Sequence, residues 1–148
     1  MKICEMKKED GSGVQKLFRQ CFAHPWTLRS LEDMFETGDY LSFVAKEGDK
    51  IIGYAGMKMV LDEADITNVA VLPSERQKGI AGKLLHRLLE EAEKRNTGRI
   101  FLEVRERNLA AVTLYEHAGF CEIGRRKNYY EDPREDALLM MWSVSSSY

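Results

Sequence analysis

Residues 68–85 combine the residue types of an anion-binding turn. A β-branched apolar segment is followed by a polar turn with Gly79 and Gly82, and then by a segment with an apolar face. A strand, a glycine-containing turn and a helix N-terminus together present unpaired backbone N–H groups to an anion. Arg76 and Lys78 add positive charge beside those groups. The stretch therefore predicts a site for a phosphate-bearing ligand.

Spacing excludes the two common phosphate-binding motifs. In a Walker loop, Gln77 would stand where the first glycine belongs, and in a dinucleotide fingerprint Ala81 and Lys83 break the glycine spacing. A plain helix start with solvated basic residues stays open as the alternative.

Glu103 and Tyr115 are the side chains best suited to proton transfer. Alternation along a strand at 100–104 places Glu103 on the face opposite Leu102 and Val104. A carboxylate on an apolar strand is costly unless it has a partner, so Glu103 is either half of a structural ion pair or a functional group. Tyr115 lies one turn before the end of a helix, where a packing role is the alternative.

Hydrophobic periodicity predicts the elements that position these residues. Strand and helix patterns alternate in the order β-αα-βββ-α-β-α-ββ, typical of an α/β (α+β) protein with one mixed sheet of about seven strands and four helices. The strands are expected at residues 1–7, 40–46, 51–61, 64–71, 100–104, 120–126 and 137–143. The helices are expected after a cap at 10–12, through 28–35 after a cap at Thr27, along the leucine-rich segment 81–92, and from an Asn108 cap to His117. A polar loop is expected at 128–136.

The topology brings the candidate residues together. Strands 64–71 and 100–104 flank a long helix, so they should be parallel neighbours in a right-handed crossover. Ligands bind at the carboxyl ends of such strands. The phosphate turn and the segment after Val104 should therefore lie at one edge of the sheet.

Length and composition indicate an ordinary globular domain. The chain has 148 residues, 44% of them hydrophobic, and a net charge of −2. We expect one domain over residues 1–144 and a frayed tail at 145–148. The small net charge and the absence of a long apolar run predict no nucleic-acid or membrane partner.

Cysteine and histidine usage favours neither disulfides nor a metal. Cys4, Cys21 and Cys121 are widely spaced and read as reduced, mostly buried thiols, which favours a cytoplasmic location. The three histidines stand at no metal-ligand spacing, and His86 is expected at the surface.

Five separated motifs resemble the GNAT N-acetyltransferases. They are N-V-A-V-x-P from residue 68, R-x-x-G-x-A from residue 76, L-E-V-R-x-x-N from residue 102, L-Y-x-x-x-G-F from residue 114, and the pair N-Y-Y (128–130) and R-E-D-A-L-x-M (134–140). That last pair, with Pro25-Trp26, resembles the narrower group of bacterial ribosomal-protein alanine N-acetyltransferases. The resemblance covers nearly the whole chain. One departure is Gln77, where members often have glycine.

The resemblance implies acetyl-coenzyme A as the co-substrate. Backbone amides of Val69, Ala70 and Val71 would bind the pantetheine arm, and Asn108 and Tyr115 would contact the coenzyme from the other side. The pyrophosphate would be held by Arg76, Gln77, Lys78, Gly79, Ile80, Ala81 and Gly82. No metal is implied.

The resemblance also implies direct attack of an amine on the thioester. Glu103 would be the base, acting directly or through a water molecule, and Tyr115 would donate a proton to the thiolate. A peptide α-amine has a reference pKa near ~8, so part of it is already neutral at neutral pH, whereas lysine, near ~10.4, is not. Trp26, Tyr129, Tyr130 and Asp136 would frame the acceptor, with Asp136 or Glu135 attracting its charge. The alternative is that these residues only form a strand and a solvated turn.

The sequence therefore predicts an enzyme that acetylates the N-terminal alanine of a small-subunit ribosomal protein. One alternative is the same fold acting on other protein N-termini, lysines or a small amine. A second alternative is a non-catalytic module that binds acyl-coenzyme A. The protein is expected to be a monomer or a weak dimer.

Overall fold

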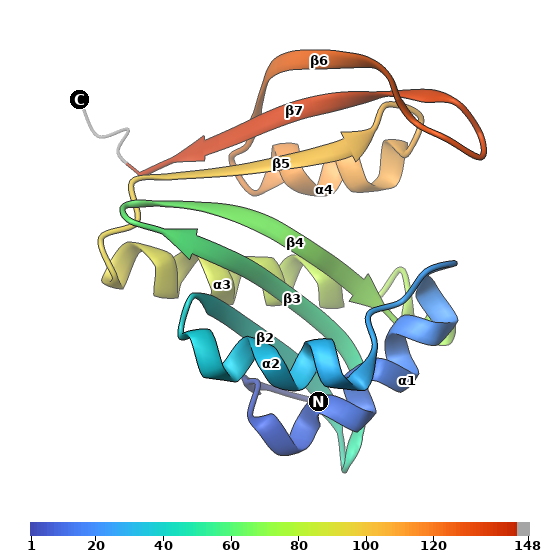
Figure 1. The fold of residues 1–148 in the computed structure, drawn as a ribbon, viewed down its shortest axis with the longest axis vertical. Helices are drawn as coiled ribbons and strands as arrows, with labels where there is room; N and C mark the ends of the chain where they lie inside the picture. The colour runs from blue at the N-terminus through green and yellow to red at the C-terminus, as the bar shows by residue number, and fades with distance from the viewer. Residues whose placement is uncertain (145–148) are drawn as a thin grey trace.

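A seven-stranded mixed sheet forms the centre of the protein, in the order β1-β2-β3-β4-β5-β7-β6 (Figure 1). The computed structural model describes residues 1–144, so the expected frayed tail at 145–148 lies outside the described residues. The strands are β1 (Lys2–Glu5), β2 (Tyr40–Glu47), β3 (Lys50–Val60), β4 (Glu63–Val71), β5 (Arg99–Arg105), β6 (Cys121–Tyr130) and β7 (Glu135–Ser143).

Four α-helices pack around this sheet in the described part of the chain. They are α1 (Gly11–Cys21), α2 (Leu28–Thr37), α3 (Ile80–Lys94) and α4 (Leu109–His117). The predicted fold class and element order are confirmed. None of the helices in residues 1–144 is long and apolar enough to cross a membrane.

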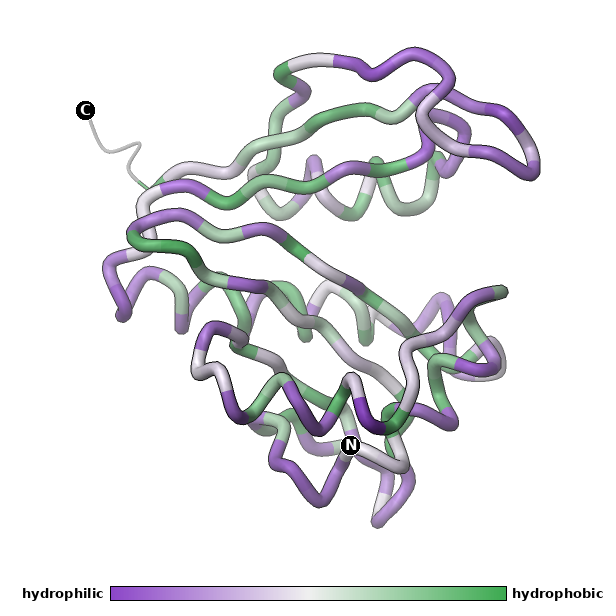
Figure 2. Tube along the Cα trace, in the orientation of Figure 1, coloured by the Kyte–Doolittle hydropathy of each residue, from purple (hydrophilic) through white to green (hydrophobic). Residues whose placement is uncertain are grey.

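Helices α1 and α3 cover opposite faces of the sheet. Phe18 of α1 packs edge-on against Tyr54 of β3, with ring centroids 5.0 Å apart. The adjacent Gly53 faces Ile80 and Leu84 of α3 so closely that an added Cβ would lie 2.8 Å from Leu84 Cδ1. Because neighbouring strand residues point to opposite faces, the sheet is buried on both sides here. Apolar segments recur along β2–β4, between polar ones (Figure 2).

Strands β4 and β5 are parallel neighbours for only three residues. The pairing joins Glu63–Asp65 to Arg99–Phe101, which confirms the predicted parallel arrangement. Beyond these residues, β4 continues to Val71 and β5 to Arg105, but the two strands no longer pair with each other. They diverge in Figure 1. The sheet is therefore open between β4 and β5 at their carboxyl ends.

The polar loop predicted at 128–136 is longer than the loop in the structure. β6 continues to Tyr130, where it pairs with Glu135 of β7, and only residues 131–134 form the turn. Nearly every residue of this edge strand is exposed, so β6 has no buried face to produce an alternating pattern. The hairpin end is hydrophilic in Figure 2.

The helix caps are correctly predicted at two of three positions. Thr27 Oγ1 accepts from the Ser30 amide at 3.1 Å, and the Asn108 side chain accepts from the Ala111 amide at 3.2 Å. Asp10 stands at the N-cap of α1 but forms no capping bond with its side chain. Its carboxylate instead accepts from the Lys7 amide and pairs with Lys46 at 2.8 Å.

The cysteine prediction needs one correction. All three thiols are free, but Cys121, at the start of exposed β6, is itself exposed, whereas Cys4 and Cys21 are partly buried. His86 is exposed as expected, with 77% of its side chain accessible. No group of three or more His, Cys, Asp or Glu side chains within residues 1–144 could hold a metal ion.

Candidate active site

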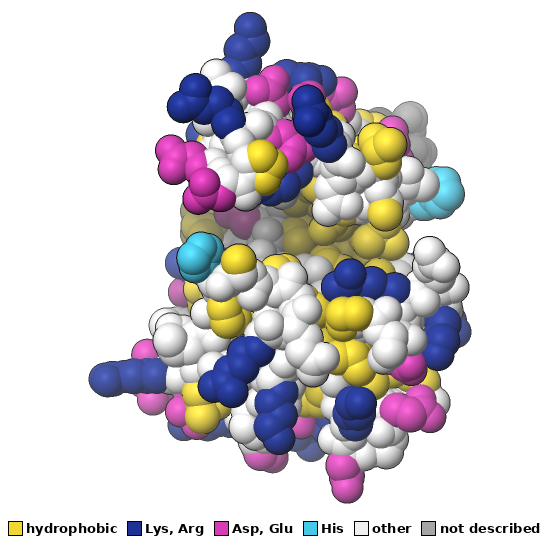
Figure 3. Space-filling model, turned by 90° about the vertical axis from the view of Figure 1, so that its right-hand side faces the viewer, with side chains coloured by type: hydrophobic (Ala, Val, Ile, Leu, Met, Phe, Trp, Pro, Cys, Tyr) yellow, Lys and Arg dark blue, Asp and Glu magenta, His cyan; other side chains and the backbone are white. Residues whose placement is uncertain are grey.

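Two cavities adjoin the part of β4 that leaves β5. We call the first the turn cavity; its volume is about 710 Å³. It is lined by Cys21, Phe22, Val69, Ala70, Val71, Glu75, Arg76, Gln77, Gly79, Ile80, Ala81, Gly82, Asn108, Ala110, Ala111, Leu114 and Tyr115. The second, the sheet cavity, has a volume of about 530 Å³. It is lined by Asp65, Ile66, Thr67, Phe101, Leu102, Glu103, Ile123, Arg126, Tyr129, Tyr130, Leu139 and Met140. Figure 3 shows a deep hollow with an apolar floor between the two halves of the molecule.

The turn cavity contains the N-terminus of α3 with its amides uncapped by any side chain. Gly79 is the N-cap residue, with φ of +79°, and an added Cβ there would meet nothing within 4 Å. The first N–H groups of a helix have no partner within it and carry a partial positive charge. Gln77 also adopts a left-handed conformation, with φ of 66°. Glycine adopts this conformation without strain, which explains why it suits the position where this chain has Gln77.

Arg76 has a structural partner at this turn. Its Nε donates to the carbonyl oxygen of Val71 at 3.0 Å, and its Nη2 lies 3.7 Å from Cys21 Sγ. The Cys21 thiol donates to the same carbonyl at 3.5 Å. Lys78 pairs with Glu75 at 3.1 Å and is not among the residues that line the cavity. Arg76 thus fixes the end of β4 against the turn.

The open edge of β4 presents backbone groups to the turn cavity. The Leu72 amide donates to Ile52, so the backbone of Leu72 faces β3. The carbonyl of the preceding residue, Val71, faces away from β3 and accepts from Arg76 and Cys21. Because successive strand residues direct their backbone groups to alternate sides, the amides of Val69 and Val71 face the gap and that of Ala70 faces β3. Of the three amides predicted for the pantetheine arm, two are therefore directed toward the gap.

Asn108 and Tyr115 reach the turn cavity from α4. Since Asn108 Oδ1 caps the helix, the side-chain NH₂ is the part left for a ligand. Tyr115 is 8% exposed and packs edge-on against Phe120, with centroids 5.7 Å apart. Burial, with a smaller contribution from Tyr130, raises the pKa of Tyr115 to about 12. Its hydroxyl is therefore protonated at neutral pH.

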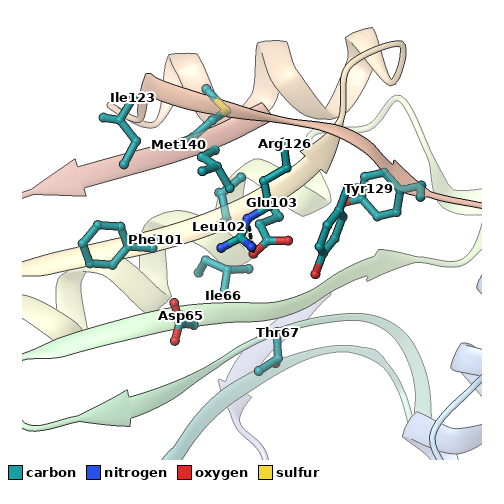
Figure 4. A pocket seen from close by; sticks show the side chains of 12 residues that line it. Asp65, Ile66, Thr67, Phe101, Leu102, Glu103, Ile123, Arg126, Tyr129 and Met140 are labelled. Carbon is teal, nitrogen blue, oxygen red and sulfur yellow. Dashed lines mark ion pairs between the residues drawn. The ribbon is translucent and has the colours of Figure 1, made fainter. Parts of the chain in front are cut away.

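Glu103 extends from β5 into the sheet cavity (Figure 4). Its neighbours Leu102 and Val104 are buried, whereas the Glu103 side chain is 33% exposed. Arg126 of β6 is its ion-pair partner, with Nε 3.8 Å from Oε1. Glu103 is therefore half of an ion pair and also reaches a cavity, and its functional role stays a prediction.

Tyr129 and Tyr130 stand beside Glu103, whereas Trp26 and Asp136 do not line either cavity. A hydrogen bond to Glu103 raises the pKa of Tyr129. Trp26 packs edge-on against Tyr40, with centroids 6.2 Å apart. Asp136 accepts from the Asn128 amide at 2.9 Å and lies 3.6 Å from Arg125, so its carboxylate supports the β6–β7 hairpin.

Three features of the site were not anticipated. β4 has a bulge at Thr67, which has no partner on β3 and whose hydroxyl donates to the Gly56 carbonyl at 3.1 Å. Arg126 and Asp65 add charge to the sheet cavity. The arginine lies in a basic run, R-R-K, but no spacing rule indicates which of the three reaches inward.

Comparison with known proteins identifies the family of this chain. The model of the acetyltransferase (GNAT) family matches residues 12–120. The [ribosomal protein bS18]-alanine N-acetyltransferase of Escherichia coli K12 is 36% identical over 146 residues, covering 97% of each chain. A putative enzyme of the same name from Bacillus subtilis is 34% identical, covering 97% of this chain and 95% of its own.

A solved structure extends the match to the fold. The crystal structure of the ribosomal-protein-S18-alanine N-acetyltransferase from Escherichia coli superposes with a TM-score of 0.86 at 35% identity, covering 99% of this chain and 96% of that one. The NatC complex bound to Gag peptide and CoA, at 23% identity and a TM-score of 0.79, shares the fold. The protein belongs to the acetyltransferase (GNAT) family, whose fold it has along its whole described length.

Proposed function

We propose that this protein transfers the acetyl group of acetyl-coenzyme A to the N-terminal α-amine of alanine in a small-subunit ribosomal protein, in the cytoplasm. The relatives that match 97% of the chain have this activity in their names. The observation that carries the proposal is the separation of β4 from β5, with a carboxylate in one adjoining cavity and a protonated tyrosine in the other.

The residues of the turn cavity fit acetyl-coenzyme A. An α-helix N-terminus without a side-chain cap suits the pyrophosphate, and the amides of Val69 and Val71 on the open edge suit the peptide-like pantetheine arm. The Asn108 side-chain NH₂ can donate from the opposite wall. We assign Gly79 to Gly82 to the pyrophosphate, with Arg76 holding the turn and Gln77 contributing its backbone.

The reaction forms a carbon–nitrogen bond and breaks the carbon–sulfur bond of the thioester. The amine nitrogen attacks the thioester carbonyl carbon, and the proton that the amine loses passes to Glu103. Because a third of the Glu103 side chain is accessible, a water molecule can carry that proton. Tyr115 gives its hydroxyl proton to the departing sulfur, and burial keeps that hydroxyl protonated until it is needed.

The sheet cavity is assigned to the acceptor. Tyr129 and Tyr130 line it from β6, and Ile66 lines it from β4. Figure 4 shows Tyr129 and Ile66 on either side of Glu103's strand, β5. We assign the acceptor contacts to these tyrosines rather than to Trp26 or Asp136, whose partners lie elsewhere.

A peptide panel tests the proposal. The protein is incubated with acetyl-coenzyme A and peptides that differ in their first residues, thiol release is measured, and mass spectrometry locates the acetyl group. We expect acetylation of the α-amine, fastest for peptides that begin with alanine. Preferential acetylation of lysine side chains or of a small amine would contradict the proposal, as would binding of acetyl-coenzyme A without turnover across the panel.

A further inference from the structure

Arg105, the last residue of β5, connects this strand to the turn between β6 and β7. Its Nη1 donates to the carbonyl oxygen of Pro133 at 2.9 Å and to Glu135 Oε1 at 3.2 Å. Its Nη2 donates to the carbonyl oxygen of Glu131 at 3.0 Å. One guanidinium thus holds the first residue of β7 and two positions of the turn.

The same guanidinium stacks on Tyr130. Its central carbon lies 4.4 Å from the centroid of the tyrosine ring, within the range of a cation–π interaction. Tyr130 ends β6 and its backbone pairs with Glu135 of β7, so its ring is held from β5 and its backbone from β7. A lysine would supply the charge but neither the planar stack nor the fork of donors.

Glu135 keeps Arg105 in this position. The Glu135 side chain is 7% exposed, and its Oε2 accepts from the Arg107 amide at 2.7 Å. That hydrogen bond lowers the pKa of Glu135, and the hydrogen bond from Arg105 adds to the effect although burial opposes it. The carboxylate is therefore ionised and fixed from two sides.

Tyr130 lies in the same cavity as Glu103, one of the two proposed proton-transfer groups. It lines the sheet cavity together with Glu103, and Glu103 contributes, after burial, to raising the pKa of Tyr130. Tyr130 in turn contributes to the raised pKa of Tyr115, which lies in the turn cavity. A displacement of this ring would therefore change the lining of the sheet cavity beside Glu103.

We propose that Arg105 is a positioning residue for the acceptor: it fixes the Tyr130 ring and the β6–β7 turn, and so holds the acceptor amine beside Glu103. Arg105 acts through Tyr130 and is not among the residues that line either cavity. The inference rests on the proposed function, because it assumes that the sheet cavity receives the acceptor.

Steady-state kinetics of Arg105→Lys test this inference. We expect the KM for a peptide that begins with alanine to rise about tenfold, since two or more hydrogen bonds and the stack are lost. The KM for acetyl-coenzyme A should stay within about twofold of the wild-type value. Arg134→Lys is the matched control: Arg134 lies in the same turn, is exposed, and has no hydrogen bond or ion pair to another residue in 1–144.

A double-mutant cycle separates positioning from general destabilisation. If Arg105 acts through Tyr130, then Arg105→Lys should raise the peptide KM much less in a Tyr130→Leu background than in the wild type. An unchanged peptide KM in Arg105→Lys would overturn the inference, and so would full additivity with Tyr130→Leu or an equal rise of both KM values. Failure of the proposed function would be seen separately, because the wild-type protein itself would not acetylate the peptide.

Discussion

Glu103, the proposed base, and Tyr115, the proposed acid, have different surroundings. Glu103 pairs with Arg126 and is partly accessible, so water can reach its carboxylate. Tyr115 is nearly enclosed, and burial keeps its proton on the oxygen. The two residues lie on consecutive elements, β5 and α4, which place them in separate cavities. This division permits one variant to be tested without disturbing the other group.

Glu103→Gln should lower kcat by a factor of about 100 or more, because the amide cannot accept the proton of the amine. The dissociation constant for acetyl-coenzyme A, measured by isothermal titration, should stay near that of the wild type, since Glu103 does not line the turn cavity. Wild-type turnover in this variant would remove Glu103 from the mechanism.

Tyr115→Phe should lower kcat while largely keeping coenzyme affinity, and it should also change stability at high pH. The folded protein holds the Tyr115 proton with a pKa of about 12, above the unfolded reference of ~10. The resulting stabilisation is fully present below pH ~10 and is lost as the pH rises through the folded value.

Urea unfolding between pH 9 and 11.5 measures this difference, with these pH limits set by the reference pKa of roughly 10. The free energy of unfolding should fall less steeply with pH in Tyr115→Phe than in the wild type. Buried Tyr54, whose pKa is also raised, is present in both proteins and serves as the common background. Identical slopes would show that Tyr115 is not the enclosed group described.

At the level of elements, caps and strand edges place the functional groups. Asn108 both starts α4, the helix that carries Tyr115, and lines the turn cavity. Gly79 starts α3 and leaves its first amides without a side-chain cap. The unpaired edge of β4 adds further amides on the same side. Each of these element ends thus belongs to the fold and also borders the proposed site.

Asn108→Ala and Asn108→Ser separate these two roles. Alanine removes the cap and should lower the free energy of unfolding by about 1 kcal/mol, whereas serine retains a capping oxygen and should cost much less. Both variants lack the side-chain NH₂, so both should bind acetyl-coenzyme A more weakly. Wild-type affinity in Asn108→Ser would limit Asn108 to its structural role.

At the level of the whole molecule, the sheet consists of two parts joined by a short contact. Strands β1–β4 form one part and β5–β7 the other, with three residue pairs between β4 and β5. The turn cavity is lined from both parts, by β4 and α3 on one side and by α4 on the other. A ligand in this cavity would therefore connect the two parts and stabilise the folded chain.

Acetyl-coenzyme A should raise the melting temperature. At a hundred times the dissociation constant, binding contributes about 2.7 kcal/mol, which for a chain of this size corresponds to roughly 5–10 °C. Thermal unfolding with and without the coenzyme measures the shift. Gly79→Ala, which forces a side chain into a left-handed conformation, should reduce both the starting stability and the shift. A coenzyme that leaves the wild-type melting temperature unchanged would contradict the assignment of the turn cavity.

Local signals in the sequence determined the elements and several of their ends. Periodicity located the strands and helices, and the Thr27 and Asn108 caps followed from hydrogen bonds made within one turn. The β6–β7 hairpin was predicted too short, because an exposed edge strand has no buried face and therefore no alternating pattern.

Only the tertiary structure decided which side chains meet. The motifs pointed to Glu103 and Tyr115, but not to the separation of β4 and β5 that opens the site between them. They also could not show that Asp136 is bound to Asn128, or that Arg105 holds Tyr130 across 25 residues of sequence. Hydrophobic periodicity shows which face of its own helix or strand a residue occupies. Contacts between elements depend on the order, twist and register of the strands in the sheet. These depend on the packing of the whole chain and not on any single segment.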